Sequence, residues 1–118
     1  MTLVAGPDRG QRTARLRERL ASRPAGERWA VVSIAGVFGL PAAFDGADAV
    51  VSVGGCPCCS ARVIFEVELV RLLRRGPWHR LLIEVDGAEA AAQLRQRLAI
   101  GPLGEHLRVD ETIVEGSQ

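Results

Sequence analysis

The sequence of 118 residues contains no lysine, no asparagine and no tyrosine, and arginine supplies its basic residues. The missing lysine and asparagine exclude any nucleotide-binding motif that depends on either residue. Cysteine is almost absent as well: the chain has three, all between Cys56 and Cys59. Any thiol chemistry is therefore confined to one short segment.

Neither sign of charge is in excess. The 15 basic and 14 acidic residues leave a formal net charge of +1, so the basic surface that nucleic acids and anionic membranes require is missing. No segment approaches the roughly 18 apolar residues of a membrane span, and residues 1–8 do not resemble a secretion signal. We therefore expect a cytoplasmic protein with no nucleic-acid or membrane partner. Thiols stay reduced in the cytoplasm, where clustered cysteines indicate metal binding or redox chemistry.

The length and the 47% hydrophobic content predict one packed domain over residues 1–118. Short apolar runs bounded by glycine or proline predict strands at residues 2–5, 29–34, 49–53, 80–84 and 109–114. Helical spacing of apolar residues predicts helices over residues 13–22, 60–75 and a segment ending near residue 98, with residues 36–48 irregular. This alternation favours a three-layer α/β/α fold of the P-loop NTPase type, with a mainly parallel sheet of about five strands.

The second predicted helix is rich in apolar residues. At helical spacing it carries Val63, Val67, Val70 and Leu73, with Phe65, Leu69 and Leu72 beside them. This pattern predicts a well-buried helix. In parallel sheets ligands bind beyond the carboxyl ends of the strands, where the loops 6–13, 54–59 and 84–87 are expected to lie.

The loop Gly6-Pro-Asp-Arg-Gly-Gln-Arg-Thr13 has the length and frame of a phosphate-binding P-loop, G-x-x-x-x-G-K-[ST]. Gly6 and Gly10 fit the frame, and Thr13 keeps the hydroxyl that binds magnesium. Gln11 replaces the second glycine and is expected to obstruct the wrap of backbone amides around phosphate. Arg12 replaces the lysine with a wider, forked cation. An ordinary strand–loop–helix turn is the alternative interpretation, although any helix N-terminus attracts anions.

The cysteine loop is more specific. In Gly54-Gly-Cys-Pro-Cys-Cys59, the thiolates of Cys56, Cys58 and Cys59 can converge on one soft cation, because the two glycines permit unusual backbone angles. Zinc or copper(I) is the chemical expectation. Three ligands leave zinc's fourth position open, as suits an ion that is passed on. Buried small side chains and a reversible disulfide are the alternatives.

A third loop, Glu84-Val-Asp-Gly87, follows an apolar strand, where nucleotide hydrolases place an acid near magnesium. Its alternative is a plain strand end and turn. His79 and His106 are predicted to be solvated, and either is a fourth metal ligand only if the fold brings it close to the cysteines.

Taken together, the order and spacing of these loops resemble the nucleotide-binding domain of the CobW-like metallochaperone GTPases, relatives of HypB and UreG. The most specific likeness is Gly55-Cys-Pro-Cys-Cys-Ser-Ala-Arg62, similar to the family's G-C-x-C-C-x-x-R, followed by the family's E-x-x-G at Glu84–Gly87. The resemblance implies that the three cysteines bind metal, that Glu84 is the acid of the nucleotide switch and that Thr13 binds magnesium.

The departures from the family pattern concern the nucleotide. The lysine is absent at Arg12, the glycine is absent at Gln11, and an N-K-x-D guanine-recognition motif cannot exist in this sequence. The acid usually found after the second strand has no clear counterpart in residues 33–39, and the chain stops before the rest of the family's domain. Losing the lysine removes a cation that stabilises transferring phosphate. We therefore expect GTP and magnesium to be doubtful ligands, with little or no hydrolysis.

We accordingly expect a module that binds or passes on metal, with zinc as the expected ion and a vestigial nucleotide site at Gly6, Gly10, Gln11, Arg12, Thr13, Glu84 and Gly87. One alternative is a working hydrolase in which Arg12 substitutes for lysine. Another is a regulatory partner that pairs with a full-length relative through a sheet edge or the apolar residues 37–40. A homodimer is a separate expectation. A client metalloprotein is a further expected partner.

Overall fold

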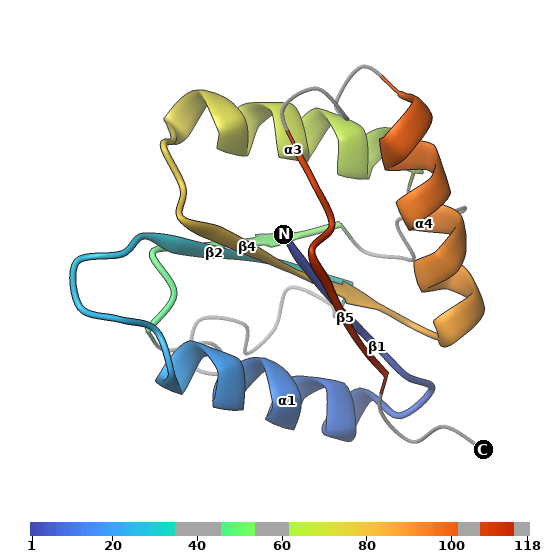
Figure 1. Ribbon diagram of the computed structural model, residues 1–118, viewed down its shortest axis with the longest axis horizontal. Coiled ribbons are helices and arrows are strands. Elements are labelled where there is room, and N and C mark those ends of the chain that lie inside the picture. The colour runs from blue at the N-terminus through green and yellow to red at the C-terminus, as the bar shows by residue number, and fades with distance from the viewer. Residues whose placement is uncertain (35–45, 54–61, 102–106, 115–118) are drawn as a thin grey trace.

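The structure is a computed structural model, and it describes residues 1–34, 46–53, 62–101 and 107–114. The strands are β1 (Thr2–Ala5), β2 (Trp29–Ser33), β3 (Ala49–Ser52), β4 (Arg80–Val85) and β5 (Glu111–Val114), and the helices are α1 (Arg9–Ala21), α3 (Arg62–Arg75) and α4 (Ala88–Ile100). The strands form one sheet in the order β3-β2-β4-β1-β5, and every pair is parallel (Figure 1).

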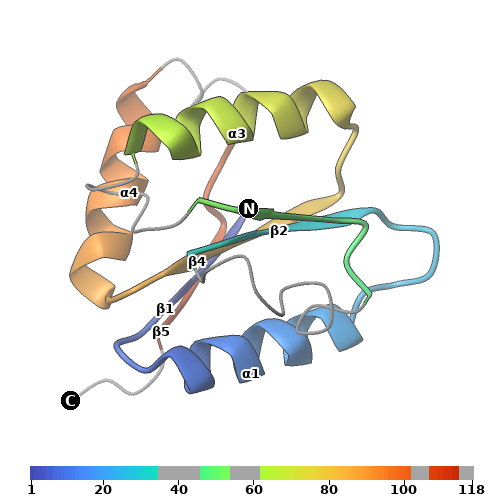
Figure 2. The ribbon, with the colours of Figure 1, turned by 180° about the vertical axis from the view of Figure 1, so that it is seen from behind.

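The helices cover both faces of the sheet. Helix α1 lies against one face, and α3 and α4 lie against the other, as the front and back views agree (Figures 1 and 2). Because successive side chains along a strand point to opposite faces of the sheet, the strands contribute side chains to the hydrophobic layers on both faces. The α1 layer contains Val4, Leu16, Leu20, Trp29, Val31 and Leu82. The opposite layer is larger and includes Leu3, Val32, Ile83, Phe65, Leu69, Leu72 and Leu94.

The expected α/β architecture is confirmed, and the five predicted strands are present within a residue or two of their predicted bounds. None of the helices in the described part of the chain is long and apolar enough to cross a membrane. The segment predicted to be irregular, residues 36–48, falls mostly outside the described residues.

The predicted start of the first helix is wrong. Helix α1 begins at Arg9 instead of near Thr13, so four residues assigned to a loop are helical. The reason is local: the Asp8 carboxylate accepts a hydrogen bond from the Gln11 backbone N–H at 2.9 Å and caps the helix one turn early. Apolar periodicity cannot detect this turn, because its residues are all polar or glycine.

The predicted burial of α3 is wrong for one of its faces. Phe65, Leu69 and Leu72 are buried against the sheet, whereas Val63 and Val67 are 66% and 46% exposed. Helical spacing fits both rows of apolar residues. The sheet takes the row with the larger side chains, since these bury more apolar area.

Candidate functional site at the carboxyl ends of the strands

Glu84 is the centre of a buried polar cluster at the carboxyl edge of the sheet. The residue is completely buried near the end of β4. Its Oε1 atom accepts hydrogen bonds from the Ser33 hydroxyl at 2.9 Å and from the Ile34 backbone N–H at 3.1 Å. Its Oε2 atom accepts a hydrogen bond from Arg12 Nε at 2.7 Å. Both carboxylate oxygens are therefore engaged within the protein.

Arg12 supplies the matching cation. It lies in the first turns of α1, is 6% exposed, and forms an ion pair with Glu84. Its Nη1 atom donates to the Gly6 carbonyl at 2.6 Å, which ties the side chain to the end of β1 as well. A buried charge needs such partners, because transfer of an unpaired ion from water to the interior is costly. The pair joins residues 72 positions apart because β1 and β4 are neighbours in the sheet.

The cluster extends to the strand that precedes the cysteines. The Ser33 carbonyl accepts a hydrogen bond from the Val53 backbone N–H at 3.0 Å. Val53 directly follows β3 and is the last described residue before the segment that contains the cysteines. One connected set of hydrogen bonds thus links α1, β4, β2 and the end of β3.

The phosphate-binding geometry expected of a P-loop is not formed by the described residues. Only Gly6, Pro7 and Asp8 separate β1 from α1, and neither Gly6 nor Gly10 adopts a positive φ. The Asp8 carboxylate occupies the N-terminus of α1, where a phosphate would otherwise be attracted to the helix. A nucleotide phosphate placed there would meet this negative charge, and the only cation in the first turns that is buried is already bound to Glu84. The described residues between β1 and the first turns of α1 therefore do not fit a nucleotide phosphate.

The other expected nucleotide contacts lie nearby. Thr13 is half-buried within α1, and Gly87 is the N-cap of α4, just after β4. Sequence reasoning identified Arg12 and Glu84 but did not pair them, and it did not identify Ser33. The signal for Ser33 was a hydroxyl that ends an otherwise apolar strand.

The metal-ligand prediction falls outside the described residues, because Cys56, Cys58 and Cys59 all belong to residues 54–61. In residues 1–34, 46–53, 62–101 and 107–114, no group of three or more His, Asp or Glu side chains could hold a metal ion. The described chain on either side of the cysteine segment is the end of β3 and the start of α3 at Arg62.

His79 is exposed, as expected, and it lies at the opposite edge of the sheet from Val53. Its Nδ1 atom accepts a hydrogen bond from the Arg28 backbone N–H at 2.9 Å, which holds the residue beside the start of β2. This position excludes His79 from a site near Val53, and His106 lies outside the described residues.

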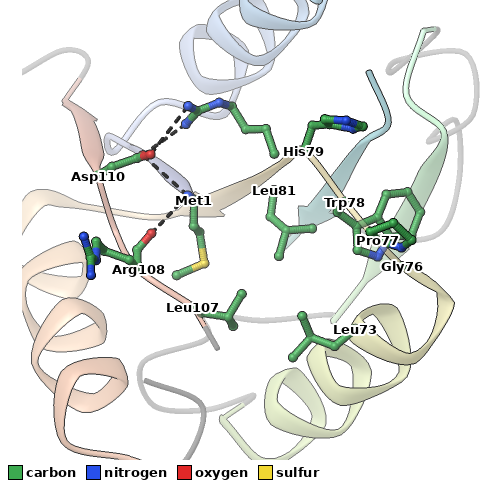
Figure 3. A pocket seen from close by; sticks show the side chains of 11 residues that line it. Met1, Leu73, Gly76, Pro77, Trp78, His79, Leu81, Leu107, Arg108 and Asp110 are labelled. Atoms are coloured by element: carbon green, nitrogen blue, oxygen red, sulfur yellow. Dashed lines mark hydrogen bonds and ion pairs between the residues drawn. The ribbon is translucent and has the colours of Figure 1, made fainter. Parts of the chain in front are cut away.

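A pocket of about 290 Å³ lies at this amino-terminal edge (Figure 3). Its apolar lining includes Met1 and Leu107, and the Met1 ammonium donates to the Arg108 carbonyl at 3.0 Å. Burial raises the pKa of Asp110, but hydrogen bonds and charge from Arg80 and the Met1 ammonium outweigh it and lower the pKa overall. The polar groups of this pocket thus pair mainly with one another.

The all-parallel sheet, the helices on both faces and the polar cluster at the carboxyl edge define an α/β domain of the P-loop NTPase type. The family model for the CobW/HypB/UreG nucleotide-binding domain matches residues 10–114, which is most of the chain. The chain therefore belongs to the CobW/HypB/UreG family. No curated protein sequence matches the chain significantly, and neither does any solved structure.

Membership of this family indicates a metallochaperone-type GTPase domain, because the family is associated with metal ions and nucleotide. The resemblance predicted from the cysteine motif and from Glu84–Gly87 is thereby confirmed at the level of the family.

Proposed function

We propose that this domain binds or passes on a metal ion and has lost GTP hydrolysis. The observation that carries the proposal is the buried ion pair between Arg12 and Glu84, 2.7 Å long, at the place where a family member handles nucleotide. The proposed ion is zinc, bound by Cys56, Cys58 and Cys59, and the proposed partner is a client metalloprotein in the cytoplasm.

Three features of the site support the proposed loss of hydrolysis. Arg12 is neutralised by Glu84 and hydrogen-bonded to Gly6, so it is not free to stabilise charge on a transferring phosphate. Asp8 places a carboxylate at the N-terminus of α1. Both oxygens of Glu84 already accept hydrogen bonds within the protein, three in all, and these compete with the ordering of a magnesium-bound water.

The metal-binding proposal rests on ligand chemistry. Three thiolates within four positions favour a soft or borderline cation over magnesium or calcium. The hydrogen bond from Val53 to Ser33 fixes the chain directly before this segment, and α3 fixes it from Arg62 onwards. Anchored ends lower the entropy lost when the thiolates gather around an ion.

Zinc titration of the anaerobically purified protein tests metal binding. We expect one tight zinc ion per chain in competition with a chromogenic chelator. Cys58→Ser and Cys59→Ser should each weaken binding at least tenfold, because each removes a thiolate. Ser60→Ala, next to the triad and without a thiol, is the matched control and should bind as the parent does. Parental affinity in both cysteine variants would overturn the proposal.

Calorimetry with magnesium and GTP, and then with ATP, tests the loss of nucleotide handling. We expect no heat of binding and no phosphate release above the rate in buffer. Micromolar affinity for either nucleotide would instead favour a working hydrolase in which Arg12 leaves Glu84 and takes the role of the missing lysine.

A further inference from the structure

Helix α3 carries a second apolar row on its outer face, away from the sheet. Val63 and Val67 are 66% and 46% exposed, and Val70 is half-buried on the same face. A shallow groove of about 310 Å³ follows this row and is lined by Glu66, Val67, Val70, Arg71 and Arg74. Ile64, also exposed, widens the apolar surface on one side. Together these residues form a contiguous apolar strip on an exposed helix face, which is a candidate interaction surface.

We infer that this outer face of α3 pairs with the same face of a second copy of the chain, with the two helices parallel. The spacing of 63, 67, 70 and 74 alternates between four and three residues, which is the a/d pattern of a two-stranded coiled coil. In that pattern Val67 and Arg74 take a positions, and Val63 and Val70 take d positions.

The charges beside the row select the orientation. Glu66 takes position g on one flank and Arg71 takes position e on the other, five residues later. A parallel pair places g of one helix beside the following e of its partner. Glu66 of each copy then faces Arg71 of the other, and the two-fold symmetry makes two such pairs. An antiparallel pair brings equivalent flanks together, so Glu66 and Arg71 do not face each other.

Both charged groups are available for this contact. Arg71 makes an ion pair with Glu68 on the same helix at 2.9 Å, yet its side chain remains 68% exposed. Glu66 is exposed and has no ion-pair partner among the described residues. The contact uses only about three turns of one helix, so the dimer is weak and its population depends on protein concentration.

Sedimentation equilibrium measures the association. Reducing agent and a chelator are present throughout, so that neither disulfides nor metal contribute and the result is independent of the proposed metal function. We expect the weight-average mass to rise from 12.7 kDa for one chain towards twice that value, between about 10 µM and about 500 µM protein. A mass that stays at one chain over this range overturns the inference.

Substitutions on α3 test the surface and the orientation. Val67→Glu should abolish association, whereas Ile100→Glu, at an 86% exposed apolar residue on α4, should leave it unchanged. Glu66→Arg and Arg71→Glu should each weaken the dimer roughly tenfold, because each converts two attractions into two repulsions. The double variant should regain most of the affinity. Additive losses in the double variant would overturn the parallel arrangement.

Discussion

Replacing Glu84 by glutamine removes the buried negative charge with little change in side-chain shape. Glutamine has nearly the same shape and keeps an oxygen that accepts from the Ser33 hydroxyl and the Ile34 N–H. The negative charge 2.7 Å from Arg12 Nε disappears, and so does the acceptor of the Arg12 hydrogen bond, because the amide nitrogen replaces Oε2. Arg12 is only 6% exposed. Breaking a buried ion pair on one side costs about 3–5 kcal/mol, because the other charge stays buried without its counterion.

This loss is large beside the total stability of a domain, which is about 5–15 kcal/mol. Urea unfolding followed by circular dichroism measures it. With an m value of about 1.5 kcal/mol/M, the midpoint should fall by roughly 2–3 M. The matched control is Glu18→Gln on the same protein, whose pair with Arg15 is 3.0 Å long but exposed. An exposed pair contributes less than about 1 kcal/mol.

A double-mutant cycle completes the test. Arg12→Met should cost about as much as Glu84→Gln, since it leaves a buried anion unpaired. The double variant has no buried charge at this position, so its loss should fall short of the sum of the single losses by at least about 2 kcal/mol. A Glu84→Gln midpoint within about 0.3 M of the parent, or strictly additive losses, would refute the reasoning.

Two smaller predictions concern the start of α1 and the amino-terminal edge of the sheet. Asp8→Ala should lower the free energy of unfolding by about 0.5–2 kcal/mol, and Asp8→Ser should restore most of it, because serine also caps the Gln11 N–H. Equal losses for both substitutions in urea titrations would argue against a capping role. The lowered pKa of Asp110 means that its charge stabilises the fold above its ordinary pKa of 3.8, and that this contribution disappears as the pH falls through the folded value. Asp110→Asn should therefore destabilise by less than about 1 kcal/mol at pH 7, with the gap from the parent closing in acid; a gap that widens there would contradict this.

The sequence was sufficient for the fold class and for the positions of the strands. Short apolar runs such as residues 29–33 are bounded by breakers, and the alternation of strands with helices favours parallel pairing. The cysteine cluster and Glu84–Gly87 were also sufficient to predict the family that the comparison identifies. Each of these features depends on residues close together in the sequence, so it can be predicted from the sequence alone.

The start of α1 and the buried face of α3 were not predictable from periodicity. The first turn of α1 has no apolar residue to mark it, and its capping bond depends on the backbone geometry at Asp8. Helix α3 has apolar residues on two faces, so the pattern fits either orientation. In the structure Phe65 faces the sheet and Val67 faces outwards. This choice depends on the shape of the sheet surface, which exists only after the strands have assembled.

By itself, the sequence determined that Arg12 stands where a lysine is expected and that Glu84 ends an apolar strand. Only the tertiary structure decided that these two residues neutralise each other. The sheet places β4 beside β1, and burial at their carboxyl ends makes an unpaired charge too costly to keep. Residue types and their spacing are encoded locally, whereas the partner of a buried charge is set by strands that meet only after the chain has folded.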